Sequence, residues 1–327
     1  MTEAPPSHSS GRDTEAPVRR RLRLGDPILR GLTLGVAVGL VALLGYLLWT
    51  LAEGAAPAFS SFGLGFFTGR QWDPVNDAFG ALPFIYGTVV TSAIAIAVAL
   101  PISVGLALLL NEVRSRLVRN PLTVLVDLLA AIPSVVYGLW GLFVMAPALN
   151  TYVAPALAAT LGRLPLVGAL FVRTPAVGNM LNAGIILAIM IVPIITAVSR
   201  EVIATVPHDL REAALALGAT RYESIRMAVL PYARSGIVGA TMLGLGRALG
   251  ETIAVSMLIG NGLGISSSLL APGYTIPAVI ANEFREATST GLQHSALLAL
   301  ALVLVAIALL LAGLSRLLVR RSERMAS

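Results

Sequence analysis

Six stretches of this chain are long and apolar enough to cross a lipid bilayer, and they constrain its fold more than any other feature. They cover approximately residues 28–51, 83–110, 122–147, 180–199, 234–259 and 292–315. A helix needs about 20 mostly apolar residues to span the hydrocarbon core. With 56% hydrophobic residues and a mean hydropathy of +0.84, the chain must have lipid as the solvent for most of its surface. We therefore predict an all-α membrane protein with six transmembrane helices.

The positions of the arginines predict how these helices are oriented. Segments 1–30, 111–120, 200–234 and 316–327 hold eighteen of the 23 basic residues, and the intervening loops hold four. Basic residues are enriched in cytoplasmic loops, so we expect both termini in the cytoplasm and external loops at 52–82 and 148–179. Residues 1–27 are predicted to be a disordered polar tail, 28–318 the transmembrane domain and 319–327 a second tail. The first apolar run is longer than the core of a cleavable signal peptide, which favours a retained span.

Missing residue types exclude several classes of chemistry. The chain has no cysteine and no lysine, because all its basic residues are arginines. Disulfides, thiolate metal sites and a P-loop lysine are therefore excluded, and any ATP must be bound by another chain. The three histidines lie in separate segments, so we expect no metal and no cofactor bound by this chain. The pI of about 10.3 reflects membrane topology rather than a nucleic-acid surface.

One predicted cytoplasmic segment, residues 206–231, mixes polar and apolar residues instead of being continuously apolar. Pro207 and Asp209 form a helix-start signal, and apolar residues then recur at helical spacing. Gly218 permits a tight turn, and a second helix is expected from about Tyr222 until Pro231 breaks it. Such a helix pair either rests on lipid headgroups or inserts into a groove of a protein partner. The residues alone favour neither.

Two charged residues, Arg247 and Glu251, fall inside the predicted fifth span. A charge near the middle of a bilayer costs about 3 kcal/mol on insertion scales, so it needs a partner or a function. The pair is expected to lie one helical turn apart, either as a structural ion pair or with Arg247 contacting an anionic substrate midway across the membrane. Ser134 and Tyr137 are further candidates for the substrate pathway, or they satisfy neighbouring backbone groups.

The 206–231 segment resembles the EAA loop of ABC-importer permeases, through Glu212, Ala213, Ala214, Gly218, Leu230 and Pro231. The family usually has Ile where this chain has Ala228, and Ile225 is a candidate to replace that bulk. The resemblance implies a type I importer permease fold. It also implies that these residues form a coupling helix, which sits in a cleft of a separate ATPase subunit and transmits its closure to the spans.

Three stretches, 79–92, 130–143 and 244–261, are similar to the PstC-type permeases of phosphate-specific ABC importers. This resemblance implies a bacterial inner-membrane complex with a second permease of PstA type, an ATPase dimer of PstB type that carries ATP and Mg, and an external phosphate-binding protein of PstS type. Arg247 and Glu251 would then take part in transport. A permease for sulfate, molybdate or a phosphonate, a proton-coupled secondary carrier and a membrane scaffold remain alternatives.

Overall fold

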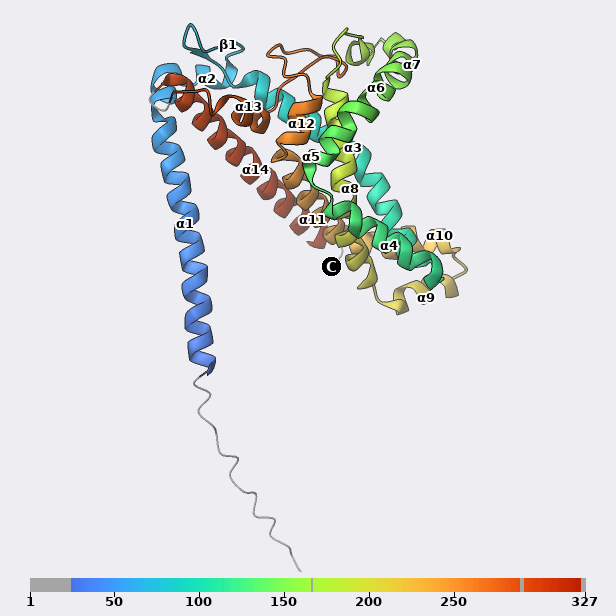
Figure 1. Ribbon diagram of the computed structural model, residues 1–327. Coiled ribbons are helices and arrows are strands. Elements are labelled where there is room, and N and C mark those ends of the chain that lie inside the picture. The colour runs from blue at the N-terminus through green and yellow to red at the C-terminus, as the bar shows by residue number, and fades with distance from the viewer. Residues whose placement is uncertain (1–24, 114, 166, 289–290, 325–327) are drawn as a thin grey trace, which may run out of the picture. The chain divides into compact units, whose positions relative to one another are not determined.

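The computed structural model describes residues 25–113, 115–165, 167–288 and 291–324, which form helices almost throughout (Figure 1). The predicted tail of residues 1–27 lies mostly outside the described residues, as do the last three residues of the predicted C-terminal tail. The elements in chain order are α1 (Gly25–Phe62), α2 (Gly65–Thr68), β1 (Trp72–Asp73), β2 (Ala78–Phe79), α3 (Leu82–Glu112), α4 (Arg116–Ala131), α5 (Ser134–Trp140), η1 (Gly141–Met145), α6 (Ala146–Ala148), η2 (Leu149–Val153), α7 (Ala154–Thr160), η3 (Leu161–Arg163), η4 (Gly168–Phe171), α8 (Met180–Ala204), α9 (His208–Ala216), α10 (Arg221–Ser224), η5 (Ile225–Val229), α11 (Leu230–Leu249), α12 (Ile253–Leu258), α13 (Ile276–Glu283) and α14 (Leu292–Arg324).

The chain divides into two units, Met1–Trp49 and Thr50–Ser327. In the first unit, the described residues form the beginning of α1 and expose large apolar side chains, among them Val41 and Trp49, which are 67% and 68% exposed. Exposed apolar side chains of this kind are what a helix surrounded by lipid presents.

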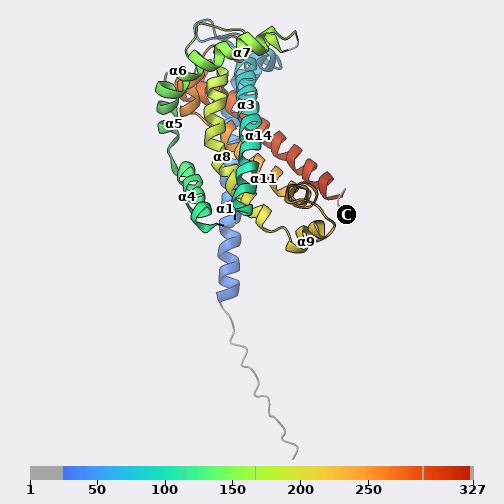
Figure 2. The ribbon, with the colours of Figure 1, turned by 90° about the vertical axis from the view of Figure 1, so that its right-hand side faces the viewer.

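The second unit is built around α8, which packs against α3 and α11 (Figure 2). Glycines allow these helices to approach closely. A Cβ added to Gly184 of α8 would lie 2.5 Å from the Ile94 side chain of α3, and one added to Gly244 of α11 would lie 2.6 Å from that of Ile195 in α8. The core here combines buried alanines from all three helices with larger apolar side chains of α8, such as Ile191 and Ile195.

Five described helices are long and apolar enough to cross a membrane: 29–62, 82–112, 134–163, 180–204 and 292–317. The predicted spans 122–147 and 234–259 are not continuous helices. The first is interrupted because Ile132 and Pro133 are extended, with ψ of 129° and 141°, as expected where proline disfavours a helical conformation in the preceding residue. The second is interrupted at residues 250–252, between α11 and α12.

The predicted external loops are also more helical than expected. Helix α1 continues to Phe62, and helical turns continue from α5 through η3 to Arg163. Two of these turns, η1 and η2, are π-helical. At the other end of the chain, α14 runs on to Arg324, beyond the predicted domain limit at residue 318.

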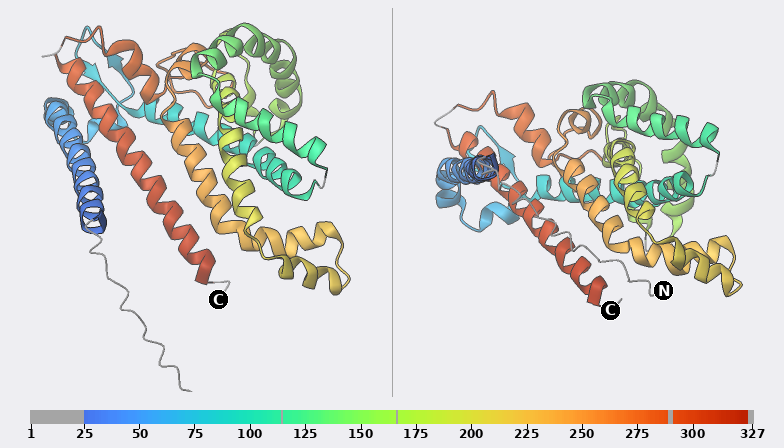
Figure 3. Two further views of the ribbon diagram at one scale, coloured as in Figure 1. Left: turned by 60° about the horizontal axis from the view of Figure 1, so that its bottom comes forward. Right: turned by 90° about the horizontal axis from the view of Figure 1, so that it is seen from below.

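The two ends of the second unit differ in structure (Figures 1 and 3). At one end, β1 pairs antiparallel with β2, and Trp72 lies opposite Phe79. The Trp72 ring contacts Phe79 and Phe84 edge-on, and its Nε1 donates to Glu283 at 2.7 Å. Helices α9 and α10 lie at the opposite end, which we call the loop end and define by residues 206–231.

Candidate functional site

The segment that resembles an EAA loop folds into the predicted helix, glycine turn and second helix. Helix α9 follows Pro207 and carries Asp209 in its first turn, where an acidic side chain suits the helix dipole. Gly218 then has φ of +86°, a conformation that favours glycine. Thr220 and Glu223 form a reciprocal capping box that starts α10. This box follows the pattern of threonine with glutamate three residues later, so it could have been found in the sequence.

The expectation that Pro231 ends the second helix is wrong. The chain stays helical from α10 through η5 into α11, where Pro231 occupies the first turn. Residues 225–229 form a π-helical turn directly before it. A proline inside a continuing helix removes one backbone hydrogen bond, and the π-helical turn directly before Pro231 is where the helix accommodates this loss. Leu230 and Pro231 therefore connect the loop to α11 without a break in the helix.

The loop end has one exposed face and one buried face. Glu212 and Ala213 are exposed, Ala214 is partly buried, and Leu217 and Met227 are 90% and 70% exposed. Val229 points the other way, into a buried cluster with Ala107, Ile203, Val206 and Ala233. An exposed apolar and acidic face on a loop that is fixed from behind fits docking against a protein partner.

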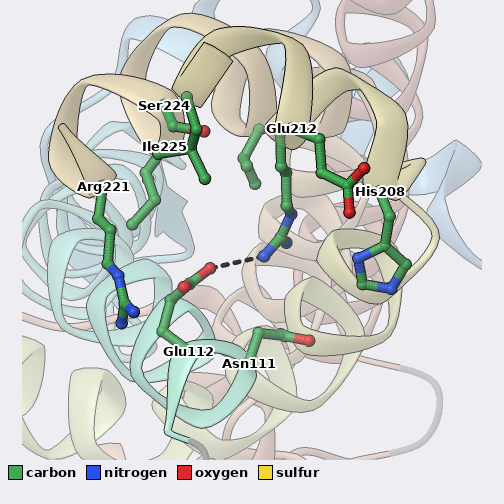
Figure 4. Close-up of a pocket in the computed structure, with 10 residues that line it drawn as sticks. Asn111, Glu112, His208, Glu212, Arg221, Ser224 and Ile225 are labelled. Atoms are coloured by element: carbon green, nitrogen blue, oxygen red, sulfur yellow. Dashed lines mark hydrogen bonds and ion pairs between the residues drawn. The ribbon is translucent and has the colours of Figure 1, made fainter. Parts of the chain in front are cut away.

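An ion pair joins this loop to α3. Nη1 of Arg211 lies 2.7 Å from Oε1 of Glu112, the last residue of α3 (dashed in Figure 4). The side chain of the adjacent Asn111 donates to the carbonyl oxygens of Ala107 and of Arg200 in α8. Sequence analysis missed this pair, because its members are 99 residues apart and no local pattern links them.

A cavity of about 310 Å³ lies behind α9 and is lined by the residues of this contact together with His208, Glu212 and Arg221 (Figure 4). The Nε atom of Arg211 is buried and has no hydrogen-bond partner among the described residues. The guanidinium of Arg211 is thus held to α3 through one nitrogen, and this contact links α9 to the end of α3.

Arg247 and Glu251 also lie together, 3.4 Å apart between Nη2 and Oε2. The prediction that both residues lie in one continuous helix is wrong, because α11 ends at Leu249 and Glu251 precedes α12. Arg247 lies in the last turn of α11, and an oxygen of Glu251 accepts from the amide of Ala254 at 3.4 Å. A cation at a helix C-terminus and an anion at a helix N-terminus both suit the helix dipoles. The break therefore stabilises both charges.

The two members of this pair differ in burial. The Glu251 side chain is 5% exposed, whereas that of Arg247 is 49% exposed. Glu251 is thus enclosed by this chain, while part of the Arg247 guanidinium remains free for another contact. A half-exposed guanidinium with a buried counter-ion is able to bind an anion.

Ser134 and Tyr137 lie at the break between α4 and α5. Ser134 begins α5 and is partly buried. The Tyr137 hydroxyl donates to the carbonyl oxygen of Leu129 at 2.8 Å, across the break. This bond satisfies a carbonyl near the end of α4, which is the backbone role that the sequence left open for Tyr137. Its oxygen can still accept a hydrogen bond.

The described residues contain no cluster of three histidine or acidic side chains that could hold a metal ion. Among the described residues, the features that fit the predicted function are the exposed face of the loop end and the Arg247–Glu251 pair between α11 and α12.

Comparisons with known proteins agree with this arrangement. A model of the family "Binding-protein-dependent transport system inner membrane component" matches residues 99–324. The phosphate transport system permease protein PstC of Mesorhizobium japonicum is 46% identical over 323 residues, which cover 99% of this chain and 98% of the relative. PstC of Pasteurella multocida is 42% identical over 91% of this chain and 92% of the relative.

Solved structures with the same fold include an ABC transporter from bacteria crystallised with an alginate-bound periplasmic protein. One of its chains matches with a TM-score of 0.58 and 21% identity, over 91% of this chain and 98% of that chain. A chain of the MetNI methionine ABC transporter in an inward-facing conformation matches with a TM-score of 0.52 and 18% identity, over 77% of this chain and 99% of that chain. These likenesses confirm the type I importer permease fold. The chain therefore belongs to the family of binding-protein-dependent transport system inner membrane components and, within it, to the PstC-type permeases.

Proposed function

We propose that this chain is a membrane-spanning permease subunit of an ATP-driven importer of inorganic phosphate. The observation that carries this proposal is the 46% identity to a PstC permease over nearly the whole length of both chains. The exposed face of the loop end supports ATP hydrolysis by a partner chain as the source of energy, because it presents Glu212 and Ala213 where an ATPase subunit would dock.

The complete importer would contain four kinds of subunit. Two ATPase chains of PstB type bind ATP and Mg, a second permease of PstA type pairs with this one, and an external protein of PstS type delivers phosphate. In this assembly the loop end and both termini lie on the cytoplasmic side, and the β1–β2 hairpin lies on the external side. The distribution of the arginines supports this orientation.

Transport would follow an alternating-access cycle. Closure of the ATPase dimer displaces α9, and the unbroken helical connection through Leu230 and Pro231 carries this displacement into α11. Arg247 lies near the other end of α11, so the same helix links the loop to the half-exposed guanidinium. The guanidinium would offset the charge of the passing anion. Glu251 would orient Arg247 and accept a hydrogen bond from the hydroxyl of hydrogen phosphate, which fully ionised sulfate does not offer.

Two alternatives, a permease for another anion and a carrier driven by protons, make different predictions. A permease for sulfate, molybdate or a phosphonate would use the same loop but a different binding protein. A proton-coupled secondary carrier would use Glu251 as a proton relay and would need no ATPase dock. The exposed loop end favours the importer over the carrier.

Uptake of radiolabelled phosphate by vesicles that contain the purified complex would test the proposal. We expect uptake only when ATP and the phosphate-binding protein are both present. An excess of unlabelled sulfate should leave uptake unchanged, and an excess of unlabelled phosphate should abolish it. Uptake by this chain alone without ATP would refute the importer, and uptake of sulfate in place of phosphate would refute the cargo.

A further inference from the structure

A second cavity lies next to the one that contains the Arg211–Glu112 ion pair, and Asn111 lines both. Its volume is about 500 Å³, and it is lined by residues at the ends of α3 and α8 and by one face of α4. The polar lining comprises Arg119, Asn120, Thr123, Arg200 and Glu201, with Asn111 between the two cavities. None of the residues singled out for transport lines this second cavity.

The two arginines of this cavity are without a salt-bridge partner in the part of the chain that the structure describes. Among the described residues, neither Arg119 nor Arg200 forms an ion pair, and Glu201 forms none either. Two positive charges and one negative charge leave a net charge of +1 in one recess. Arginines from two different helices, α4 and α8, therefore line one recess with an excess of positive charge. Such a recess favours an anion, and arginine suits phosphate oxygens in particular.

Helix α4 supplies an apolar surface next to this recess. Its polar residues recur at helical spacing on one face, which carries Arg116, Arg119, Asn120 and Thr123. Leu117, Val124 and Leu128 lie on another face and are 88%, 55% and 63% exposed. Val124 also lines the cavity, so the polar recess is continuous with the apolar face. A helix with this division suits the boundary between lipid headgroups and acyl chains.

We propose that this cavity binds the phosphodiester headgroup of an anionic phospholipid from the cytoplasmic leaflet. Arg119 and Arg200 contact the phosphate, the hydroxyls of a phosphatidylglycerol headgroup donate to Glu201, and the acyl chains lie along Leu117, Val124 and Leu128. Basic pockets between transmembrane helices on the cytoplasmic side are a known form of anionic lipid site. The inference uses the proposed orientation of the chain, but it does not depend on phosphate as the cargo.

The test measures lipid binding directly in the purified four-component transporter. The complex is placed in nanodiscs of phosphatidylethanolamine, and spin-labelled phosphatidylglycerol is titrated in. We expect Arg119→Gln and Arg200→Gln each to weaken the association about fivefold, and the double variant about 30-fold. Arg116→Gln is the matched control, because Arg116 lies on the same face of α4 but does not line the cavity. This control should bind like the unaltered complex.

Competition on the unaltered complex provides a second measurement that requires no substitution. Unlabelled phosphatidylglycerol should displace the labelled lipid, and added salt should weaken its binding. Equal displacement by phosphatidylcholine, a zwitterionic lipid that the discs do not contain, would refute the charge selectivity. Displacement by inorganic phosphate would mean that the cavity takes free anion rather than lipid, and would overturn the proposal. Equal loss of binding in Arg116→Gln and in the double variant would also overturn it.

These outcomes are independent of transport. A complex that binds phosphatidylglycerol as expected but imports no phosphate would refute the proposed function and leave the lipid site standing. A complex that imports phosphate but shows no preference for phosphatidylglycerol would refute the lipid site alone.

Discussion

Replacing Glu112 with Gln is expected to uncouple ATP hydrolysis from transport while leaving the transporter assembled. Glu112 is the last residue of α3, and its carboxylate holds Arg211 of α9 at 2.7 Å. The exposed face of α9 is not altered by this change, so the ATPase should still dock and hydrolyse ATP. What is lost is the contact through which a displacement of α9 acts on α3.

The magnitude follows from the geometry and burial of the ion pair. Hydrogen bonds to charged groups contribute about 1.5–3 kcal/mol, and fully exposed ion pairs contribute about 0–1 kcal/mol. The Arg211 and Glu112 side chains are 20% and 33% exposed, between these two cases. We therefore expect about 1–2 kcal/mol, which corresponds to about a 5- to 30-fold change in an equilibrium between attached and detached positions of the loop.

The assay measures phosphate uptake and ATP hydrolysis in the same vesicles and compares their ratio. Glu112→Gln and Arg211→Gln should each lower the phosphate imported per ATP, and the charge-swapped double variant Glu112→Arg with Arg211→Glu should recover most of it. Arg221→Gln is the control, because Arg221 lines the same cavity and forms no ion pair among the described residues. The reasoning is refuted if the charge swap is no better than the single variants, or if the control loses coupling equally.

Three further predictions concern the loop end and the charged pair. Gly218→Val should cost about 1–2 kcal/mol because φ is +86° there and should weaken co-purification of the ATPase, whereas Gly239→Ala, at a helical glycine with open space around it, should not. Hydrogen bonds from the Thr220 backbone amide and hydroxyl lower the pKa of Glu223. The capping box is therefore fully stabilising above the ordinary glutamate pKa and is lost as pH falls through the lowered value. The protection of residues 220–224 from hydrogen exchange, measured against the unfolded chain at the same pH, should therefore fall at acidic pH, and Glu223→Gln should remove this pH dependence. Glu251→Gln should reduce phosphate flux without reducing assembly of the complex, and unchanged uptake in that variant would refute the role of Glu251 in transport.

The interruptions of the predicted spans show where apolar composition is an incomplete guide. The stretches 122–147 and 234–259 have the hydropathy of spans, yet both contain a break. The first break could have been foreseen from Pro133, because proline restricts the residue before it. The second is only weakly signalled, by Gly250 at the end of α11 and Arg247 in its last turn, because glycine permits a helix to end without requiring it. The packing of α12 against α5 and α8 lies outside any local pattern.

Several features were accessible from the residues alone because they depend on local chemistry or composition. The apolar runs indicated a helical membrane protein, since lipid leaves few other ways to satisfy a buried backbone. The turn at Gly218 followed from the conformational freedom of glycine. The likeness of residues 206–231 to an EAA loop also pointed to the family before any geometry was known.

Tertiary structure alone decided how distant residues meet. The Glu112–Arg211 pair joins residues 99 positions apart, and the second cavity combines arginines from α4 and α8. It also decided that Glu251 is buried at the start of one helix while Arg247 stays half exposed at the end of another. Charge and hydropathy along a chain determine which solvent each segment prefers. The positions at which helices break and pack depend on contacts between segments, and these contacts determine which charges are paired and which remain free to bind.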